Sequence, residues 1–112
     1  MQSGKIEVAN NDGTYVVKLS GDVRLNLCSA LEGYLDEMFL DEAFETVLID
    51  LSDAEGVDST TLGQLAKISI ISQEKFGLIP TIISPREDIT RILLSMGFDK
   101  VFYLIGDVPD EI

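Results

Sequence analysis

Histidine is absent from this sequence of 112 residues, and cysteine occurs once, as Cys28. Without histidine the chain lacks the commonest general base near neutral pH, the Ser-His-Asp and Cys-His arrangements that activate a nucleophile, and imidazole ligands for a metal. A single cysteine cannot form a disulfide within the chain, which favours a reducing compartment. These absences argue against an enzyme of the common hydrolytic types, and we expect no catalytic residue, no metal and no cofactor.

Basic residues are scarce as well. Eight Lys and Arg stand against 20 Asp and Glu, which leaves a formal net charge of −12. Such a surface repels nucleic acid and anionic membranes, so neither is expected as a partner, and a protein with a basic surface is favoured instead. Long apolar runs are also lacking: none approaches the roughly 18 residues of a membrane span, and the opening MQSGKIEVANNDG has no signal-peptide core. We therefore expect a cytoplasmic protein that is not inserted in a membrane.

Strand and helix patterns alternate through the chain and predict one domain over residues 1–112, with an ordered core at about 5–105 and an acidic tail at 106–112. Strands are expected at 5–8, 14–19, 47–51, 78–83 and 101–105, and the turn signal Asn10-Asn11-Asp12-Gly13 joins the first two. The resulting order, β-β-α-β-α-β-α-β, predicts an α/β fold with a mixed, mainly parallel sheet of about five strands.

Three helical patterns lie between the strands. Asn26 is a candidate N-cap of the first, Gly77 ends the second, and Gly97 ends the third. The third should begin with a capping box in Ser84-Pro85-Arg86-Glu87. The apolar spacing predicts buried stripes at Leu27, Ala30, Leu31, Tyr34, Leu35, Met38 and Phe39, at Leu62, Leu65, Ala66, Ser69 and Phe76, and at Ile89, Ile92, Leu93 and Met96.

The stretch EGVDSTTLGQL, residues 55–65, places one acid and three hydroxyls between a buried strand and the second helix. Asp58 or Ser59 could cap that helix. Gly56 would permit a tight turn, and Gly63 would let the helix approach a neighbouring chain. The two threonines that follow Ser59 have mediocre helix propensity, so helix formation alone does not account for them.

A phosphate-binding loop is not indicated here, because the stretch has no GxxxxGK[ST] pattern, and a hydrolase elbow of the GxSxG type is also missing. A metal between Asp53 and Asp58 is a weaker alternative, since acids in loops are usually solvated. The remaining chemistry is modification of Ser59. A phosphate would add about −1.5 to −2 charges beside these acids, which the helix N–H groups tolerate and a docked partner would not.

The segment VLIDLSDAEGVDSTTLGQL, residues 47–65, resembles the signature of STAS domains, in particular of bacterial anti-sigma factor antagonists. That signature is an apolar strand ending in aspartate, a short loop, and then Asp-Ser-(Ser/Thr)-x-(Leu/Met)-Gly opening a helix. The upstream LSGDVRL, residues 19–25, is similar to a segment that precedes the first helix of the family. The positions that match the signature are Asp50, Asp58, Ser59, Thr60, Leu62 and Gly63.

The resemblance implies a non-enzymatic protein-binding switch. In that family an anti-sigma factor acts as the kinase of the serine, a PP2C-type serine phosphatase reverses the modification, and only the unphosphorylated form binds the partner. Carried over, Ser59 would be the phosphorylated residue, and Thr61 would add bulk where the family usually has Gly or Ala. Ile71, an apolar residue on the polar face of the second helix, would extend the surface. The expected partner-binding residues are Asp58, Ser59, Thr60, Thr61, Gly63, Gln64 and Ile71.

Two alternatives within the same family remain open at this point. The chain could be a STAS subunit of a membrane transporter complex, with the serine loop as a constitutive contact. It could also regulate a target that is not a sigma-factor system. The sequence does not predict an oligomeric state.

Overall fold

The computed structural model describes residues 4–23, 28–84 and 86–106, without the side chain of Cys28. Along the chain it contains β1 (Lys5–Asn11), β2 (Thr14–Val23), α1 (Cys28–Leu40), β3 (Thr46–Asp50), β4 (Ala54–Val57), α2 (Ser59–Phe76), β5 (Thr81–Ile83), α3 (Glu87–Ser95), the short 3₁₀ helix η2 (Phe98–Lys100) and β6 (Tyr103–Ile105). Every helix and strand expected from the sequence is present among the described residues. Asn26 and Leu27 lie outside them.

The strands form one sheet in the order β1-β2-β3-β5-β6, and β4 pairs with β2 beside this path. The β1–β2 hairpin is antiparallel, and the other pairs are parallel. The predicted mixed, mainly parallel α/β fold is therefore confirmed. The sequence missed β4, because Ala54–Val57 is a run of four residues with no apolar alternation that could reveal it. Its partner β2 runs four residues beyond the predicted strand, and the register shifts between Gly21 and Asp22.

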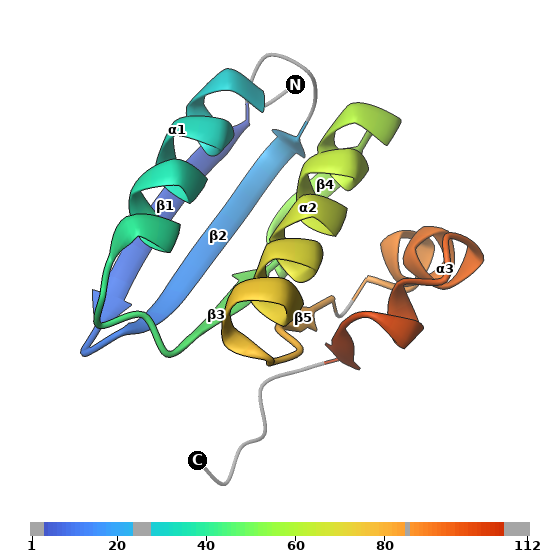
Figure 1. Cartoon of the computed structure of the whole chain (residues 1–112). Coiled ribbons are helices and arrows are strands. Elements are labelled where there is room, and N and C mark those ends of the chain that lie inside the picture. The colour runs from blue at the N-terminus through green and yellow to red at the C-terminus, as the bar shows by residue number, and fades with distance from the viewer. Residues whose placement is uncertain (1–3, 24–27, 85, 107–112) are drawn as a thin grey trace, which may run out of the picture.

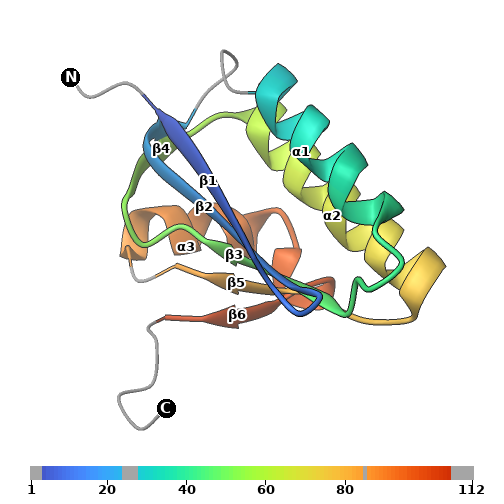
Figure 2. The same ribbon diagram turned by 90° about the vertical axis from the view of Figure 1, so that its left-hand side faces the viewer.

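Helices α1 and α2 lie side by side over one face of the sheet (Figures 1 and 2). Alternate residues of the central strands point into the space beneath them, as the two-residue period of a strand requires. These residues, among them Val17, Leu19 and Ile49, are at most 1% exposed and belong to a single core cluster with α1, α2 and α3. The strand register places Ala9, Val16, Leu48, Thr81 and Tyr103 in one row across the opposite face, outside that cluster.

The predicted buried stripes of the helices are too wide. In α1, Leu31, Leu35, Met38 and Phe39 are buried as expected, whereas Tyr34 is 42% exposed. In α3, Ile89 and Leu93 are buried, but Ile92 and Met96 are 40% and 53% exposed. Ala30 is exposed, Ala66 only half-buried, and Phe76 37% exposed. A helix that rests on a sheet buries a sector of limited width, so residues at the flanks of an apolar stripe stay in water.

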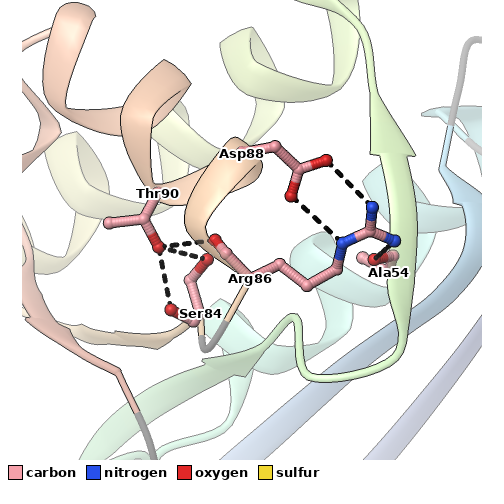
Figure 3. A network of polar contacts seen from close by, with 5 residues as sticks. All are labelled: Ala54, Ser84, Arg86, Asp88 and Thr90. Atoms are coloured by element: carbon pink, nitrogen blue, oxygen red, sulfur yellow. Dashed lines mark hydrogen bonds and ion pairs between the residues drawn. The ribbon is translucent and has the colours of Figure 1, made fainter.

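The predicted capping box of α3 is also wrong, as Figure 3 shows. Ser84 continues β5, where its N–H donates to the Ile105 carbonyl at 2.9 Å, and the helix starts later than predicted, with its N-cap at Arg86; Pro85 of the predicted box lies outside the described residues. The Thr90 hydroxyl lies 3.0 Å from Ser84 Oγ and 2.8 Å from the Ser84 carbonyl oxygen. Arg86 takes the N-cap position without a side-chain cap, and its guanidinium donates to Asp88 and to the Ala54 carbonyl. The start of α3 is thus tied to β5 and β4 by tertiary contacts.

Candidate functional site

The second helix begins where the sequence placed the motif. Asp58 has extended backbone angles, φ −113° and ψ 173°, and its Oδ1 accepts a hydrogen bond from the Thr61 N–H at 2.9 Å. This is the geometry of an N-cap, which satisfies one of the backbone donors that the first helical turn leaves free. Of the two capping candidates, Asp58 is therefore the cap, and Ser59 is the first residue of α2.

The motif is held at the end of β2 by β4. Asp22 pairs with Gly56 and Val23 with Val57, so β4 delivers α2 to that end of the sheet. Gly56 lies within this strand and is not among the glycines with positive φ, so the tight turn expected there is not present. The sharp backbone conformation falls instead on Gly21, with φ 72°, beside the irregularity of β2.

The hydroxyls of the motif point in different directions. Ser59 and Thr60 are exposed, and within the described part of the chain the Ser59 hydroxyl has no hydrogen-bond partner. Thr61 is 1% exposed, and its Oγ1 donates to the Val23 carbonyl at 3.3 Å. Since each residue of a helix is turned by about 100° from the last, Thr61 faces the sheet while Ser59 faces solvent. The expectation that Thr61 makes the exposed start of the helix bulkier is therefore wrong, because its side chain is buried.

Ile71 was expected to be exposed on α2, but the exposed isoleucine of this helix is its neighbour, Ile70. Ile71 is partly buried and packed against the core, and it lines a groove of about 340 Å³ between α1 and α2. The neighbouring Ile70 is 53% exposed. Gly63 is exposed, and a Cβ added there would meet nothing within 4 Å. Gln64 is half-buried, and its Oε1 is a buried acceptor without a partner in the described structure.

Two ion pairs lie on or near α2. Lys67 on α2 lies 3.7 Å from a carboxylate oxygen of Glu32 on α1. Asp53, in the loop before β4, is held by Lys18 at 2.8 Å, and this hydrogen bond and charge raise the pKa of the Lys18 ammonium. Asp53 thus serves an ion pair with β2. Among the residues that the structure describes, no group of three or more acidic or cysteine side chains could hold a metal ion.

A second hollow, of about 520 Å³, lies beside the β3–β4 loop and has Ser52, Asp53, Glu55, Lys5 and Arg86 in its wall. Its acids and bases are mixed, and Ser59 is not part of the lining. No helix in the described part of the chain is both long enough and apolar enough to cross a membrane.

Comparison with known proteins gives a consistent result. The family described as Mlab, STAS domain, matches residues 6–106. The anti-sigma-F factor antagonist RsfB of Mycobacterium tuberculosis is 32% identical over 110 residues, which cover 96% of this chain and 85% of RsfB.

Solved structures agree in fold. The crystal structure of an anti-sigma factor antagonist from Mycobacterium paratuberculosis has a TM-score of 0.76 at 27% identity, covering 95% of this chain and 88% of the other. The Bacillus protein SpoIIAA has a TM-score of 0.73 in both its unphosphorylated and its phosphorylated form, at 14% and 12% identity. These alignments cover 97% and 96% of this chain, and 92% and 94% of SpoIIAA. At such low identity the likeness to SpoIIAA shows the fold alone.

Proposed function

The chain belongs to the STAS domain family, and we propose that it is a cytoplasmic anti-sigma factor antagonist whose binding is switched by phosphorylation of Ser59. The relative RsfB, an anti-sigma-F factor antagonist, supports the general role. The switch rests on one observation: Ser59 is exposed at the first position of α2, and the described fold makes no use of its hydroxyl. In this role the chain binds and is modified but catalyses nothing.

Phosphorylation of Ser59 would change the surface and leave the fold intact. The phosphate would add about −1.5 to −2 charges at a helix N-terminus, where backbone N–H groups and the helix dipole favour an anion. The capping carboxylate of Asp58 lies directly before it. A partner that covers the bare Ser59 and the exposed Thr60 would have to desolvate this added charge, and it would dissociate.

The proposed partners follow from the same chemistry. An anti-sigma factor that acts as a serine kinase would provide the docking surface and would bind the ATP, since this chain has no phosphate-binding loop of its own. A PP2C-type serine phosphatase would restore the bare hydroxyl. The net charge of −12 favours a kinase that is basic around the contact, while the part of its surface that covers Ser59 itself would present apolar or acidic groups, which disfavour a phosphate.

The test uses purified anti-sigma factors of the organism that produces this chain, examined one at a time by calorimetry. One of them should bind the wild-type chain and Ser59→Ala alike, and should bind Ser59→Asp at least about tenfold more weakly, because an anion at a desolvated interface is costly. The matched control is Ser29→Asp, which adds the same charge to the exposed first turn of α1. With ATP, the same protein should phosphorylate the wild-type chain on Ser59.

Equal weakening by Ser59→Asp and Ser29→Asp would reduce the effect to overall charge and contradict a local switch. If no anti-sigma factor binds, and the chain instead stays in a membrane complex of its native cell with Ser59 unmodified, the transporter-subunit alternative replaces this proposal. Binding to a protein outside the sigma-factor systems, with Ser59 still controlling it, would keep the switch and change only its output.

A further inference from the structure

The outer side of α2 carries a line of exposed residues that begins at Ser59. Successive members are three or four positions apart, the spacing that brings helical residues to the same side. We name it the α2 line and define it as Ser59, Gly63, Lys67, Ile70 and Glu74, all of which are exposed. The helix lies in front of the sheet in Figure 1, so this outer side is turned away from the core.

Ile70 is the apolar member of the α2 line. It is 53% exposed, while its neighbours Ile68 and Ser69 are fully buried. It belongs neither to the core cluster nor to the partly buried residues packed against it, which include Ile71. A single exposed isoleucine is common and by itself indicates no site. Its alignment with the proposed switch residue is what distinguishes Ile70 from the other exposed apolar residues.

The charges beside Ile70 indicate the chemistry of a matching surface. Lys67, one turn before it, is paired with Glu32 of α1, so its ammonium is already compensated. Glu74 follows one turn later, and no ion pair of Glu74 occurs among the described residues. On the α2 line the local surface is therefore an apolar side chain with the Glu74 carboxylate beside it, while the exposed Lys75 lies further round the helix, where it lines the groove toward α1 together with Asp36. This local surface fits an apolar depression with a basic rim on a protein surface.

We infer that the anti-sigma factor that reads Ser59 also seats Ile70 in such a depression, with a basic side chain against Glu74. This inference rests on the proposed function and names the second half of the same contact. At about 1.5 Å per residue, Ile70 lies about 16 Å along the helix from Ser59. Because that exceeds the screening length of about 8 Å at physiological salt, a phosphate on Ser59 weakens the complex at the Ser59 end and has little direct effect on the free energy of the Ile70 contact. Recognition is thus divided between an end that phosphorylation controls and an apolar anchor that it does not.

The experiment compares the wild-type chain with four full-length variants, Ile70→Ser, Leu94→Ser, Ser59→Asp and the double variant, in binding to the anti-sigma factor that binds the wild type. Ile70→Ser should weaken binding by about tenfold, as removal of a buried interface anchor does. Leu94→Ser is the matched control: Leu94 is also on a helix, α3, and is 50% exposed, and its replacement should change affinity less than about twofold. In the double variant Ser59→Asp with Ile70→Ser, the two losses should multiply, because sites this far apart act independently.

Three outcomes separate the inference from the function it rests on. If Ile70→Ser and Leu94→Ser bind equally well while Ser59→Asp still weakens binding, the anchor is overturned and the switch stands. If Ile70→Ser loses binding only when Ser59 is bare, the two ends are coupled and the division of roles is overturned. If no anti-sigma factor binds the wild-type chain, both fall together. Circular dichroism of each variant should match the wild type.

Discussion

Gly63 is a glycine in the interior of α2, at a position where the chain itself would accommodate a side chain. An added Cβ would meet nothing within 4 Å, as also holds for Gly33 in α1. Glycine in a helix interior costs about 0.8–1 kcal/mol relative to alanine, because its unfolded backbone has more freedom to lose. At Gly63 we attribute this cost to contact with a partner protein, because the residue lies one turn after Ser59 on the α2 line. There it would allow a partner surface to approach closely.

Gly63→Ala should therefore raise the free energy of unfolding by up to about 1 kcal/mol and weaken binding to the anti-sigma factor. Gly33→Ala should stabilise the chain to a similar extent and leave binding unchanged. Urea unfolding and calorimetry measure the two quantities on the same samples. Unaltered binding by Gly63→Ala would place Gly63 outside the interface.

At the scale of the elements, one contact ties β2 to the connection between α1 and β3. The Tyr15 hydroxyl donates to Asp41 Oδ2, and Asp41 Oδ1 accepts from the Ala43 N–H at 2.9 Å. The hydrogen bond from Tyr15 is the main cause that lowers the pKa of the Asp41 carboxyl, and the same bond raises the pKa of Tyr15. Asp41 immediately follows α1, so this contact fixes the C-terminal end of that helix against β2.

The stability from this contact should depend on pH in a defined direction. Because the pKa of Asp41 is lower in the folded chain than its unfolded value of about 3.9, the contribution is present above that pH and is lost as the pH falls through the folded pKa. Tyr15→Phe should thus destabilise the chain near neutral pH, and its difference from the wild type should shrink below about pH 4. Urea unfolding at both pH values measures this.

The control for this prediction is Tyr103→Phe, since Tyr103 is 63% exposed on β6. It should follow the wild type at both pH values. A Tyr15→Phe difference that is the same near neutrality and in acid would mean that the loss does not come from the carboxylate. It would then come from contacts that do not titrate: the hydrogen bond that Asn10 Nδ2 donates to the Tyr15 hydroxyl at 3.2 Å, or the stacking of the ring on Phe44, with ring centroids 5.9 Å apart.

At the scale of the whole molecule, the dominant electrostatic feature is the excess of acids. The described ion pairs engage Lys5, Lys18, Lys67, Arg86 and Arg91, each with one carboxylate, while the net charge of the chain remains −12. Most carboxylates therefore repel one another across the surface. Such self-repulsion lowers the stability of the compact state and speeds association with a basic partner.

Salt should consequently stabilise the isolated chain near neutral pH. Raising NaCl from about 10 mM to about 200 mM shortens the screening length from about 30 Å to under about 10 Å, so the melting temperature should rise by a few degrees. Near the isoelectric pH of about 4.1 the same addition should have little effect, because the net charge is then close to zero. An equal rise at both pH values would attribute the effect to general salt action.

Features that depend on neighbouring residues were determined by the sequence alone. Gly77, with φ 66°, ends α2 as predicted, by donating to the carbonyls of its last turn, while the sequence narrowed the cap at the start of that helix to Asp58 or Ser59. The turn at Asp12 and Gly13 has positive φ at both residues, as the hairpin signal predicts. Together with the alternation of strands and helices, these local signals were enough for the α/β class and for the position of Ser59 at a helix start.

What only the tertiary structure decided concerns contacts between distant segments. Burial of Thr61 requires the Val23 carbonyl to lie beneath α2, and Ser84 is held by Ile105 and Thr90 where a capping box was expected. Whether Ile70 or Ile71 faces water depends on α1 covering one side of α2. The physical reason is common to these cases. Periodicity shows which residues of a helix share a side, but burial is set by what packs against that side, and this is known only once the chain has folded.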